Sequence, residues 1–313
     1  AGATQWWPRQ AAPLAVRLAL PVQINSAPVF VGQAQGLFAK AGVSLHVQPF
    51  LLGKDALKAV IDGNADLAIV ADTPFMFAVL GGNDVAAVAS ISEARRALAI
   101  VARRDHGIAT MAELKGKTVG LTMGTNSPYF LEATLQANRM HAADLSLRDM
   151  QVDAYIAAFK GGEIDAAVVF QPYLAQLQRD MGQAISVFFG EDVYAFRFLL
   201  VGQPAYIQSH PQEVQRVLNA LIQAKAAIHA DPTGTGAMVA KAVGIAPELM
   251  ATLFDPQDYD VTLDQGLLLA LDDQTRWAIK SGLAKPGQVP NYLHHLAYRD
   301  LEAVSPSAVR IVR

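Results

Sequence analysis

Four short polar segments have the composition of an oxyanion-binding site. Free N–H groups at a helix N-terminus, together with the positive end of the helix dipole, favour anionic or polar oxygens. Each segment follows an apolar run and precedes a helix-like pattern: Asn25-Ser26-Ala27-Pro28, Asp72-Thr73-Pro74, Gly124-Thr125-Asn126-Ser127-Pro128 and Phe170-Gln171-Pro172-Tyr173. The same residue types cap ordinary helices. One segment alone therefore indicates only a cap, whereas four that face one crevice indicate a binding cleft.

No pattern for catalysis or metal binding accompanies these segments. Gly116-Lys117-Thr118 resembles the end of a phosphate-binding loop, but Met111 occupies a required glycine position and Lys117 would begin a strand. The seven histidines lack zinc-ligand spacing, and the absence of cysteine excludes a thiolate ligand or nucleophile. Four clustered aspartates lack the Gly and Glu of a calcium loop, and we interpret them as helix caps and a solvated turn: Asp255, Asp258, Asp260 and Asp264. We expect no catalytic residue, metal site or cofactor.

The composition is typical of a folded chain that binds neither nucleic acid nor a membrane surface. The length of 313 residues suits two domains or one large one, and the share of apolar residues, 52% against 17% charged, provides a buried core. A net charge of −3 excludes the basic stripe of a nucleic-acid binder and a polybasic membrane-surface protein. The uncharged stretch 18–39 contains prolines and polar side chains, so it does not predict a membrane span. The chain opens without the regions of a signal peptide, and we expect a leader to have been removed or never present.

Alternating strand and helix patterns must position the four polar segments. A strand is predicted at 14–21, followed by a helix from Ser26 to Lys40, and the same order restarts after 103–107. From 211 to about 282 the pattern is helical, with breaks at Asp231-Pro232, Gly244 and Asp255-Pro256. Further strands are predicted at 43–47, 66–71, 85–91, 97–101, 117–121, 148–152, 165–170 and 185–189. The alternation predicts an α/β fold with mostly parallel sheets covered by helices.

A weak internal repeat indicates two similar lobes. Residues 59–68 match residues 158–167 at an offset of 99, so that Gly63 aligns with Gly162 and Asp66 with Asp165. In each copy a helix ends on Gly, and an Asp precedes an apolar strand that leads to a Pro-initiated helix. Residues 1–13 lie before the first pattern, and we expect an irregular arm there.

The order of these motifs resembles the nitrate/sulfonate/taurine-type solute-binding proteins of ABC importers, which include the NMT1/THI5-like and SsuA/TauA-like proteins. The resemblance spans about residues 14–300. It rests on loose motifs in a specific order: Ala27-Pro28, 36–43, 63–68, Asp72-Thr73-Pro74, 114–120, Gly124-Thr125-Asn126-Ser127, 162–166 and Gln171-Pro172-Tyr173. The same fold family includes binders of thiamine-pyrimidine precursors and a related enzyme that makes such a precursor.

This resemblance implies a two-lobed type II periplasmic-binding-protein fold that closes by a hinge motion around its ligand. Each lobe would hold a mixed, mostly parallel sheet flanked by helices, and two crossover strands, Ile100–Arg104 and Phe196–Gln203, would join them. Lobe one would comprise 14–102 plus 203–313, and lobe two 103–202. The partners implied are a small-molecule ligand, an ABC-transporter permease and its ATPase. We expect a periplasmic or extracytoplasmic monomer that meets the membrane only through the permease or a lipid anchor.

The resemblance also implies which residues bind the ligand. Asn126 stands where many members have Ser, and Gln171 where many have Asp, so the ligand class departs from the common one. Asp72 supplies an acid elsewhere: it either pairs with a ligand amine or ring donor or only caps the helix that follows. The complete set expected at the site is Gln23, Asn25, Ser26, Asp72, Thr73, Ser92, Glu93, Gly124, Thr125, Asn126, Phe170, Gln171, Tyr173 and Tyr194.

Four functions remain to be distinguished. The leading one is capture of a small organic anion or zwitterion, such as a sulfonate, taurine or a carboxylate. The second is the same fold binding a pyrimidine-like or aromatic heterocycle. A precursor-synthesising enzyme would, by resemblance, need a Cys-rich stretch, and this chain has no Cys. A sensor lobe would need a fused membrane segment. Aromatic residues near the polar segments favour an organic ligand if they line the cleft: Phe75, Tyr129, Phe170, Tyr173, Tyr194 and Phe196.

Overall fold

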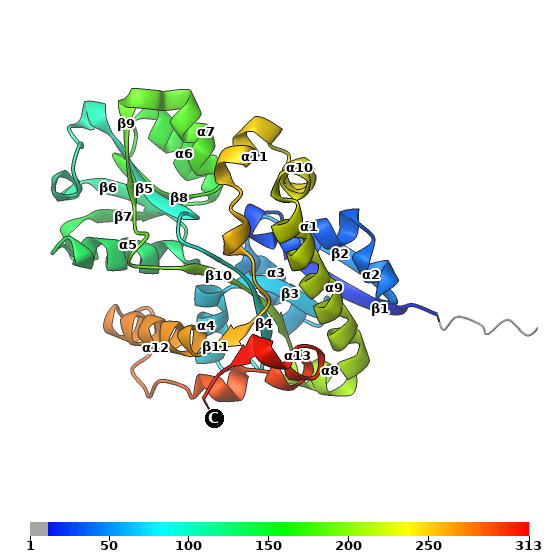
Figure 1. The fold of residues 1–313 in the computed structure, drawn as a ribbon. Coiled ribbons are helices and arrows are strands. Elements are labelled where there is room, and N and C mark those ends of the chain that lie inside the picture. The colour runs from blue at the N-terminus through cyan, green and yellow to red at the C-terminus, as the bar shows by residue number, and fades with distance from the viewer. Residues whose placement is uncertain (1–11, 313) are drawn as a thin grey trace, which may run out of the picture.

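Two five-stranded sheets, each flanked by helices, form two lobes (Figure 1). The computed structural model describes residues 12–312, so most of the arm expected at 1–13 lies outside the described residues. In lobe one the strand order is β2 (Val43–Phe50), β1 (Leu14–Pro21), β3 (Leu67–Ala71), β10 (Phe196–Gly202) and β4 (Ala86–Ala94). In lobe two it is β7 (Ser146–Asp149), β6 (Thr118–Leu121), β8 (Ala166–Phe170), β5 (Leu98–Arg103) and β9 (Ile185–Phe189). The predicted two-lobed α/β architecture is confirmed.

Helices cover both sheets, and most of them belong to lobe one. Lobe two has α5 (Ser127–Ala137), α6 (Val152–Gly161) and α7 (Tyr173–Met181). In lobe one the N-terminal part contributes α1 (Ala27–Ala34), α2 (Leu37–Lys40), α3 (Gly53–Ile61) and α4 (Asp72–Leu80). The C-terminal part adds α8 (Pro204–Ser209), α9 (Pro211–Ala230), α10 (Pro232–Val243), α11 (Pro247–Leu253), α12 (Gln265–Lys280) and α13 (Tyr298–Val304), with the short strands β11 (Leu263–Asp264) and β12 (Val309–Arg310).

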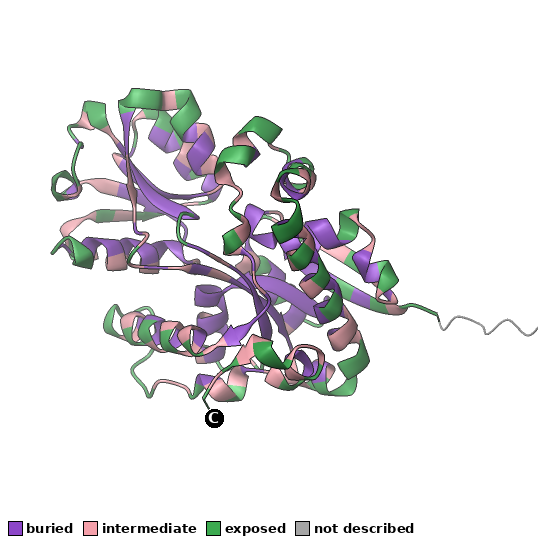
Figure 2. Cartoon of the chain, viewed as in Figure 1, coloured by how far each residue is buried: buried purple, intermediate pink, exposed green. Residues whose placement is uncertain are grey.

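The central strands form the core of each lobe. Every residue of β3 and of β8 is buried, and both strands are continuous apolar runs (Figure 2). Such runs are expected of strands that are covered by helices on both faces. The polar segments after β3 and β8 are consequently held at the ends of rigid strands.

Each sheet contains one antiparallel strand in its interior. β10 lies antiparallel between β3 and β4 in lobe one, and β5 lies antiparallel between β8 and β9 in lobe two. The chain thus passes between the sheets at 95–97 and again at 190–195, whereas the sequence placed the lobe boundaries at 102–103 and 202–203. Two short connections therefore join the two lobes.

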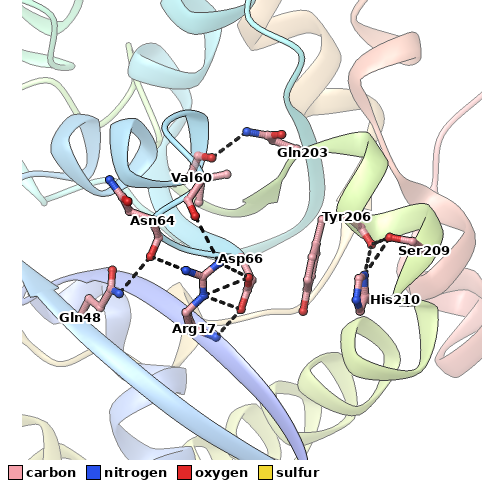
Figure 3. Close-up of polar contacts among 10 residues, drawn as sticks. Arg17, Gln48, Val60, Asn64, Asp66, Gln203, Tyr206, Ser209 and His210 are labelled. Carbon is pink, nitrogen blue, oxygen red and sulfur yellow. Dashed lines mark hydrogen bonds and ion pairs between the residues drawn. The ribbon is translucent and has the colours of Figure 1, made fainter.

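The repeated aspartates occupy matching positions in the two lobes. Asp66 precedes β3 and accepts a hydrogen bond from the backbone N–H of Arg17 in β1 at 2.7 Å, and the guanidinium of Arg17 contacts the same carboxylate (Figure 3). Asp165 precedes β8 and accepts one from the backbone N–H of Thr118 in β6 at 2.7 Å. Each carboxylate therefore ties the start of a central strand to its neighbour, which explains the repeat physically.

Two helical predictions were tested by the structure. The helix expected from Ser26 to Lys40 is divided into α1 and α2, because Gly36 adopts a φ of 65° between them. The breaks expected near Asp231, Gly244 and Asp255 are confirmed, since helices end or begin at all three. Among the described residues no single helix is long and apolar enough to cross a membrane, and α10 and α11, which together reach that length, are bent by 116°.

Candidate functional site

A fully buried carboxylate joins the two lobes. Asp72 is the first residue of α4 and is 0% exposed. Its Oδ1 accepts hydrogen bonds from the hydroxyl of Tyr194 at 2.5 Å and from Nδ2 of Asn126 at 2.7 Å. Its Oδ2 accepts one from Nε2 of Gln274 in α12 at 2.7 Å. Because Asn126 lies just before α5 in lobe two, this network connects the polar segments of both lobes.

The electrostatics of the network follow from its burial. Removal from water raises the pKa of Asp72 above its ordinary value, while the donors Tyr194, Gln274 and Asn126 and the charge of Arg197 oppose that rise. Burial, followed by the nearby charge of Asp72, raises the pKa of Tyr194 well above its ordinary value. The Tyr194 hydroxyl therefore keeps its proton and acts as a donor. Asn126 also contacts the Tyr194 oxygen, so the three side chains form one unit.

The structure bears on the two roles that the sequence left open for Asp72. The residue before it, Ala71, occupies the N-cap position of α4, and no side-chain cap bond is formed there. The Asp72 carboxylate instead contacts three side chains from other elements. Pairing of Asp72 with a ligand amine stays a prediction.

A small cavity of about 30 Å³ lies between the polar segments of the two lobes. Four of the expected residues line it: Gln23, Thr125, Asn126 and Phe170. The rest of the lining is Leu52, Gly53, Lys54, Ala71, Pro74, Leu98, Ser127 and Phe196. A cavity of this size is on the scale of a water molecule. An organic solute is therefore too large for this cavity alone.

Two helix starts and one ammonium group give this small cavity its chemistry. Helix α3 begins at Gly53 in lobe one, and α5 begins at Ser127 in lobe two. The ammonium of Lys54 reaches across the lobes and donates to the backbone carbonyl of Met123 at 3.1 Å. Helix N-termini and a lysine both favour an oxyanion. The position therefore suits the anionic end of a solute.

A second, much larger cavity of about 1070 Å³ borders the same segments. Four further expected residues line it: Asn25, Ser92, Glu93 and Gln171. It lies between α7 of lobe two, the connection at 95–97 and the lobe-one segment 249–260. Its lining residues Asn25, Ala97 and Gln171 are close in sequence to Gln23, Leu98 and Phe170 of the small cavity, so the two cavities are neighbours along three segments.

The remaining expected residues line neither of these two cavities. Ser26 is buried, and its hydroxyl donates to the carbonyl of Pro21 at 2.8 Å. Thr73 is buried in the first turn of α4. Gly124 adopts a φ of 72° in the loop before α5. Tyr173 contacts Phe170 edge to face, with ring centroids 5.5 Å apart.

Local hydrogen bonds occupy the hydroxyl of Thr125. Its Oγ1 donates to the carbonyl of Thr122 at 2.6 Å and accepts from the N–H of Ser127 at 3.2 Å. These bonds shape the loop that places Asn126 opposite Asp72. A bond from Thr125 to a ligand would have to replace the one to Thr122, and such a bond stays a prediction.

Sequence reasoning missed Lys54, Gln274 and Asp258. Lys54 resembles any solvated lysine in a first helical turn, and Gln274 lies 202 residues from its partner Asp72. Asp258 belongs to the aspartate cluster that we assigned to caps, and Asp255 and Asp264 do accept N–H groups in that way, at 2.9 and 3.0 Å. No group of three His, Asp or Glu among the described residues is placed to hold a metal ion.

Comparison of sequences identifies the family of the chain. The model of the NMT1/THI5-like family matches residues 23–235. A putative aliphatic sulfonates-binding protein of Bacillus subtilis is 25% identical over 203 residues, which are 63% of this chain and 60% of that protein. The taurine-binding periplasmic protein of Escherichia coli is 25% identical over 167 residues, 53% of this chain and 52% of that protein. The match thus spans less than two thirds of either relative.

Comparison with solved structures extends the likeness to nearly the whole chain. The periplasmic aliphatic sulphonate-binding protein SsuA of E. coli has a TM-score of 0.79 at 20% identity and covers 91% of this chain and 92% of its own. SsuA of Xanthomonas axonopodis pv. citri, bound to MOPS, has a TM-score of 0.78 at 20% identity and covers 96% of this chain and 99% of its own. The desulfurization enzyme DSZB has a lower TM-score of 0.70 at 14% identity and covers 93% of this chain and 99% of its own. The fold is therefore that of the periplasmic binding proteins.

Proposed function

The chain belongs to the NMT1/THI5-like family, and from this premise we propose that it is the solute-binding component of an ABC importer. The solute is a small organic anion or zwitterion of the sulfonate, taurine or carboxylate type. One observation carries the proposal: eight of the expected polar and aromatic residues, drawn from both lobes, line two neighbouring cavities where the lobes meet. The names of the relatives, which bind aliphatic sulfonates or taurine, support the class.

The anionic end of the solute binds in the smaller cavity. There it replaces the Met123 carbonyl as the acceptor of the Lys54 ammonium. Bonds from an ammonium to a charged acceptor are shorter and stronger than those to a neutral carbonyl, so the exchange favours the anion. The side chain of Asn126 and the N-terminus of α5 provide further donors.

Binding is coupled to a hinge motion at 95–97 and 190–195. Opening would break the contact of Asp72 with Asn126, and closing would restore it around the solute, with the solute's anion in place of the Met123 carbonyl as the acceptor of Lys54. The partners proposed are a membrane permease and its ATPase, which would receive the solute from the closed monomer outside the cytoplasm. We propose no catalytic role, in keeping with relatives that are binding proteins.

A pyrimidine-like or other aromatic heterocycle is the second candidate. Two aromatic rings, Phe170 and Phe196, line the smaller cavity and could stack on a flat ligand. Asp72, whose pKa burial raises, could accept from a ring N–H. This candidate uses the same cleft and differs only in the solute.

Calorimetric titration separates the two candidates. The panel contains ethanesulfonate, taurine, a short-chain carboxylate and a hydroxymethyl-aminopyrimidine. We expect one of the first three to bind and to raise the unfolding temperature. Native mass spectrometry of gently purified protein identifies any solute that is carried along. Binding of the pyrimidine alone would overturn the anion proposal in favour of the second candidate.

A further inference from the structure

The larger cavity contains a carboxylate that the rest of the described protein leaves unpaired. Asp258 ends the short 3-10 turn Pro256–Asp258 and lines the cavity. Within residues 12–312 its side chain has no hydrogen-bond or ion-pair partner. Its neighbours differ, because Asp255 accepts the N–H of Gln257 at 2.9 Å and Asp260 pairs with Lys225 at 2.9 Å. Asp258 is thus not explained by capping or pairing.

The arginines of the same cavity are already paired. Each of the four contacts a carboxylate: the pairs are Arg95–Glu93, Arg96–Glu191, Arg179–Asp180 and Arg310–Asp260. Glu93 is further paired with Arg197 at 2.7 Å. The lining holds six carboxylates against these four arginines, so the field in the cavity is negative.

A second unpaired group points to a ligand at the same place. Ser92 lines the cavity, is 1% exposed, and its hydroxyl has no hydrogen-bond partner in the part of the chain that the structure describes. A buried polar group without a partner is destabilising. A bound N–H donor would satisfy the Ser92 oxygen.

We propose that the larger cavity holds a cationic N–H group of the solute, an ammonium or a guanidinium, which pairs with Asp258 and donates to Ser92. The inference rests on the proposed solute-binding function and narrows the class to solutes with a positive group. A metal ion fits less well, because no three acidic or His side chains among the described residues are placed to ligate one. A zwitterion would contact Asp258 at one end and Lys54 in the neighbouring cavity at the other.

This arrangement makes binding of the cation depend on pH. Burial, then the negative charges of Asp255 and Glu93, raises the pKa of Asp258 to about 7. The carboxylate is neutral below that pH and charged above it, so affinity for a permanent cation rises as pH increases through 7. The other charged or titratable groups of the surrounding elements are Lys225 and His229 of α9, Tyr259, Asp260, Asp264, Arg310, Arg95, Arg96, Arg179, Arg197 and Glu191.

Three matched probes test the inference: 2-guanidinoethanesulfonate with both charges, ethanesulfonate with the anion alone, and ethylguanidinium with the cation alone. The guanidinium stays protonated across the pH range used, so that changes in affinity report the protein. Calorimetry at pH 6 and pH 8 should show 2-guanidinoethanesulfonate binding about tenfold or more tightly than ethanesulfonate at pH 8, and less difference at pH 6. Asp258→Asn should remove both the difference and its pH dependence.

Controls separate this inference from the proposed function. Asp62→Asn removes the same charge from an exposed carboxylate that pairs with Lys58 outside the cavity, and should leave all affinities unchanged. Ser92→Ala should lower the affinity for the guanidinium probes about threefold without affecting the affinity for ethanesulfonate.

Equal binding of 2-guanidinoethanesulfonate and ethanesulfonate would overturn the inference and leave the anion proposal intact. Asp258-dependent binding of ethylguanidinium with no binding of either sulfonate would support the inference and overturn the sulfonate class. No binding of any probe would overturn both, and the wild-type pH profile decides if Asp258→Asn does not fold.

Discussion

Replacing Asp72 with Ala and, separately, with Asn tests whether the buried network holds the lobes together. In Asp72→Ala, three donors lose their acceptor: the Tyr194 hydroxyl, Nδ2 of Asn126 and Nε2 of Gln274. A buried donor left unpaired costs about 1–3 kcal/mol, so the variant should lose about 3–9 kcal/mol if the lobes stay closed. Opening the lobes would return Asn126 and Tyr194 to water, so part of this loss should appear as opening instead of unfolding.

Asp72→Asn should behave quite differently. The Asn side chain keeps an oxygen for Tyr194 and Asn126, and it presents an NH₂ group to Gln274. The Oε1 of Gln274 is buried and has no partner within the described residues, so rotation of its amide would allow it to accept from the new NH₂ group. We therefore expect this variant to stay within about 1 kcal/mol of the wild type.

The pH dependence gives the second half of this test. Burial raises the pKa of Asp72 in the folded protein. The fold therefore binds that proton more tightly than the unfolded chain does, and its contribution to stability is largest at low pH and is lost as pH rises through the folded pKa. The asparagine side chain does not titrate, so Asp72→Asn lacks this pH dependence. The free energy of unfolding of Asp72→Asn should thus increase relative to that of the wild type as pH increases.

Urea unfolding and small-angle scattering provide the measurements. Unfolding of the wild type and both variants between pH 5 and pH 8 gives the free energies, and scattering gives the radius of gyration of each. Asp72→Ala should be less stable and more expanded than Asp72→Asn at every pH. The reasoning is refuted if the two variants are equally stable and equally compact, because the three hydrogen bonds would then contribute nothing.

Four further predictions concern the solute. Lys54→Met should lower the affinity for an anionic solute about tenfold or more in calorimetry, because it removes the charged donor of the small cavity. The control Lys58→Met, one turn along α3, should leave the affinity unchanged, and equal effects of the two variants would contradict the role of Lys54. Thr125→Ala with Asn126→Ala should remove two bonds at about 0.5–1.5 kcal/mol each and cost about tenfold in affinity, and unchanged affinity in a folded double variant would exclude them as ligand donors. If a ligand amine or ring donor pairs with Asp72, Asp72→Asn should cut affinity strongly, and tighter binding of the solute by that variant would show instead that Asp72 only repels an anion. Scattering with saturating solute should give a smaller radius of gyration than without it, and an unchanged radius across the whole panel would count against hinge closure.

The sequence predicted those features that depend on neighbouring residues. Local patterns indicate the strand ends, the helix starts and the repeated Asp66 and Asp165. In the structure each of these aspartates accepts a hydrogen bond from a backbone N–H of the neighbouring strand in its own lobe. The two crossings of the chain between the sheets, before β5 and before β10, were predicted several residues away, because antiparallel pairing of these strands with distant strands decides which sheet they join. Lys54 was missed for a similar reason, since only the contact between the lobes brings its ammonium to Met123, which lies 69 residues away.

Two carboxylates with raised pKa values, the fully buried Asp72 and the half-buried Asp258, have different surroundings in this cleft. Burial raises the pKa of both Asp72 and Asp258. Asp72 accepts hydrogen bonds from three donors of the protein itself, and these bonds hold the lobes together. Asp258 has no donor from the described residues and borders a cavity large enough for an organic solute. A perturbed pKa alone therefore does not identify a binding residue. What distinguishes Asp258 is that it borders the large cavity with no donor from the described residues. Asp72→Ala should therefore act on the contact between the lobes, and Asp258→Asn on selection of the solute's charge.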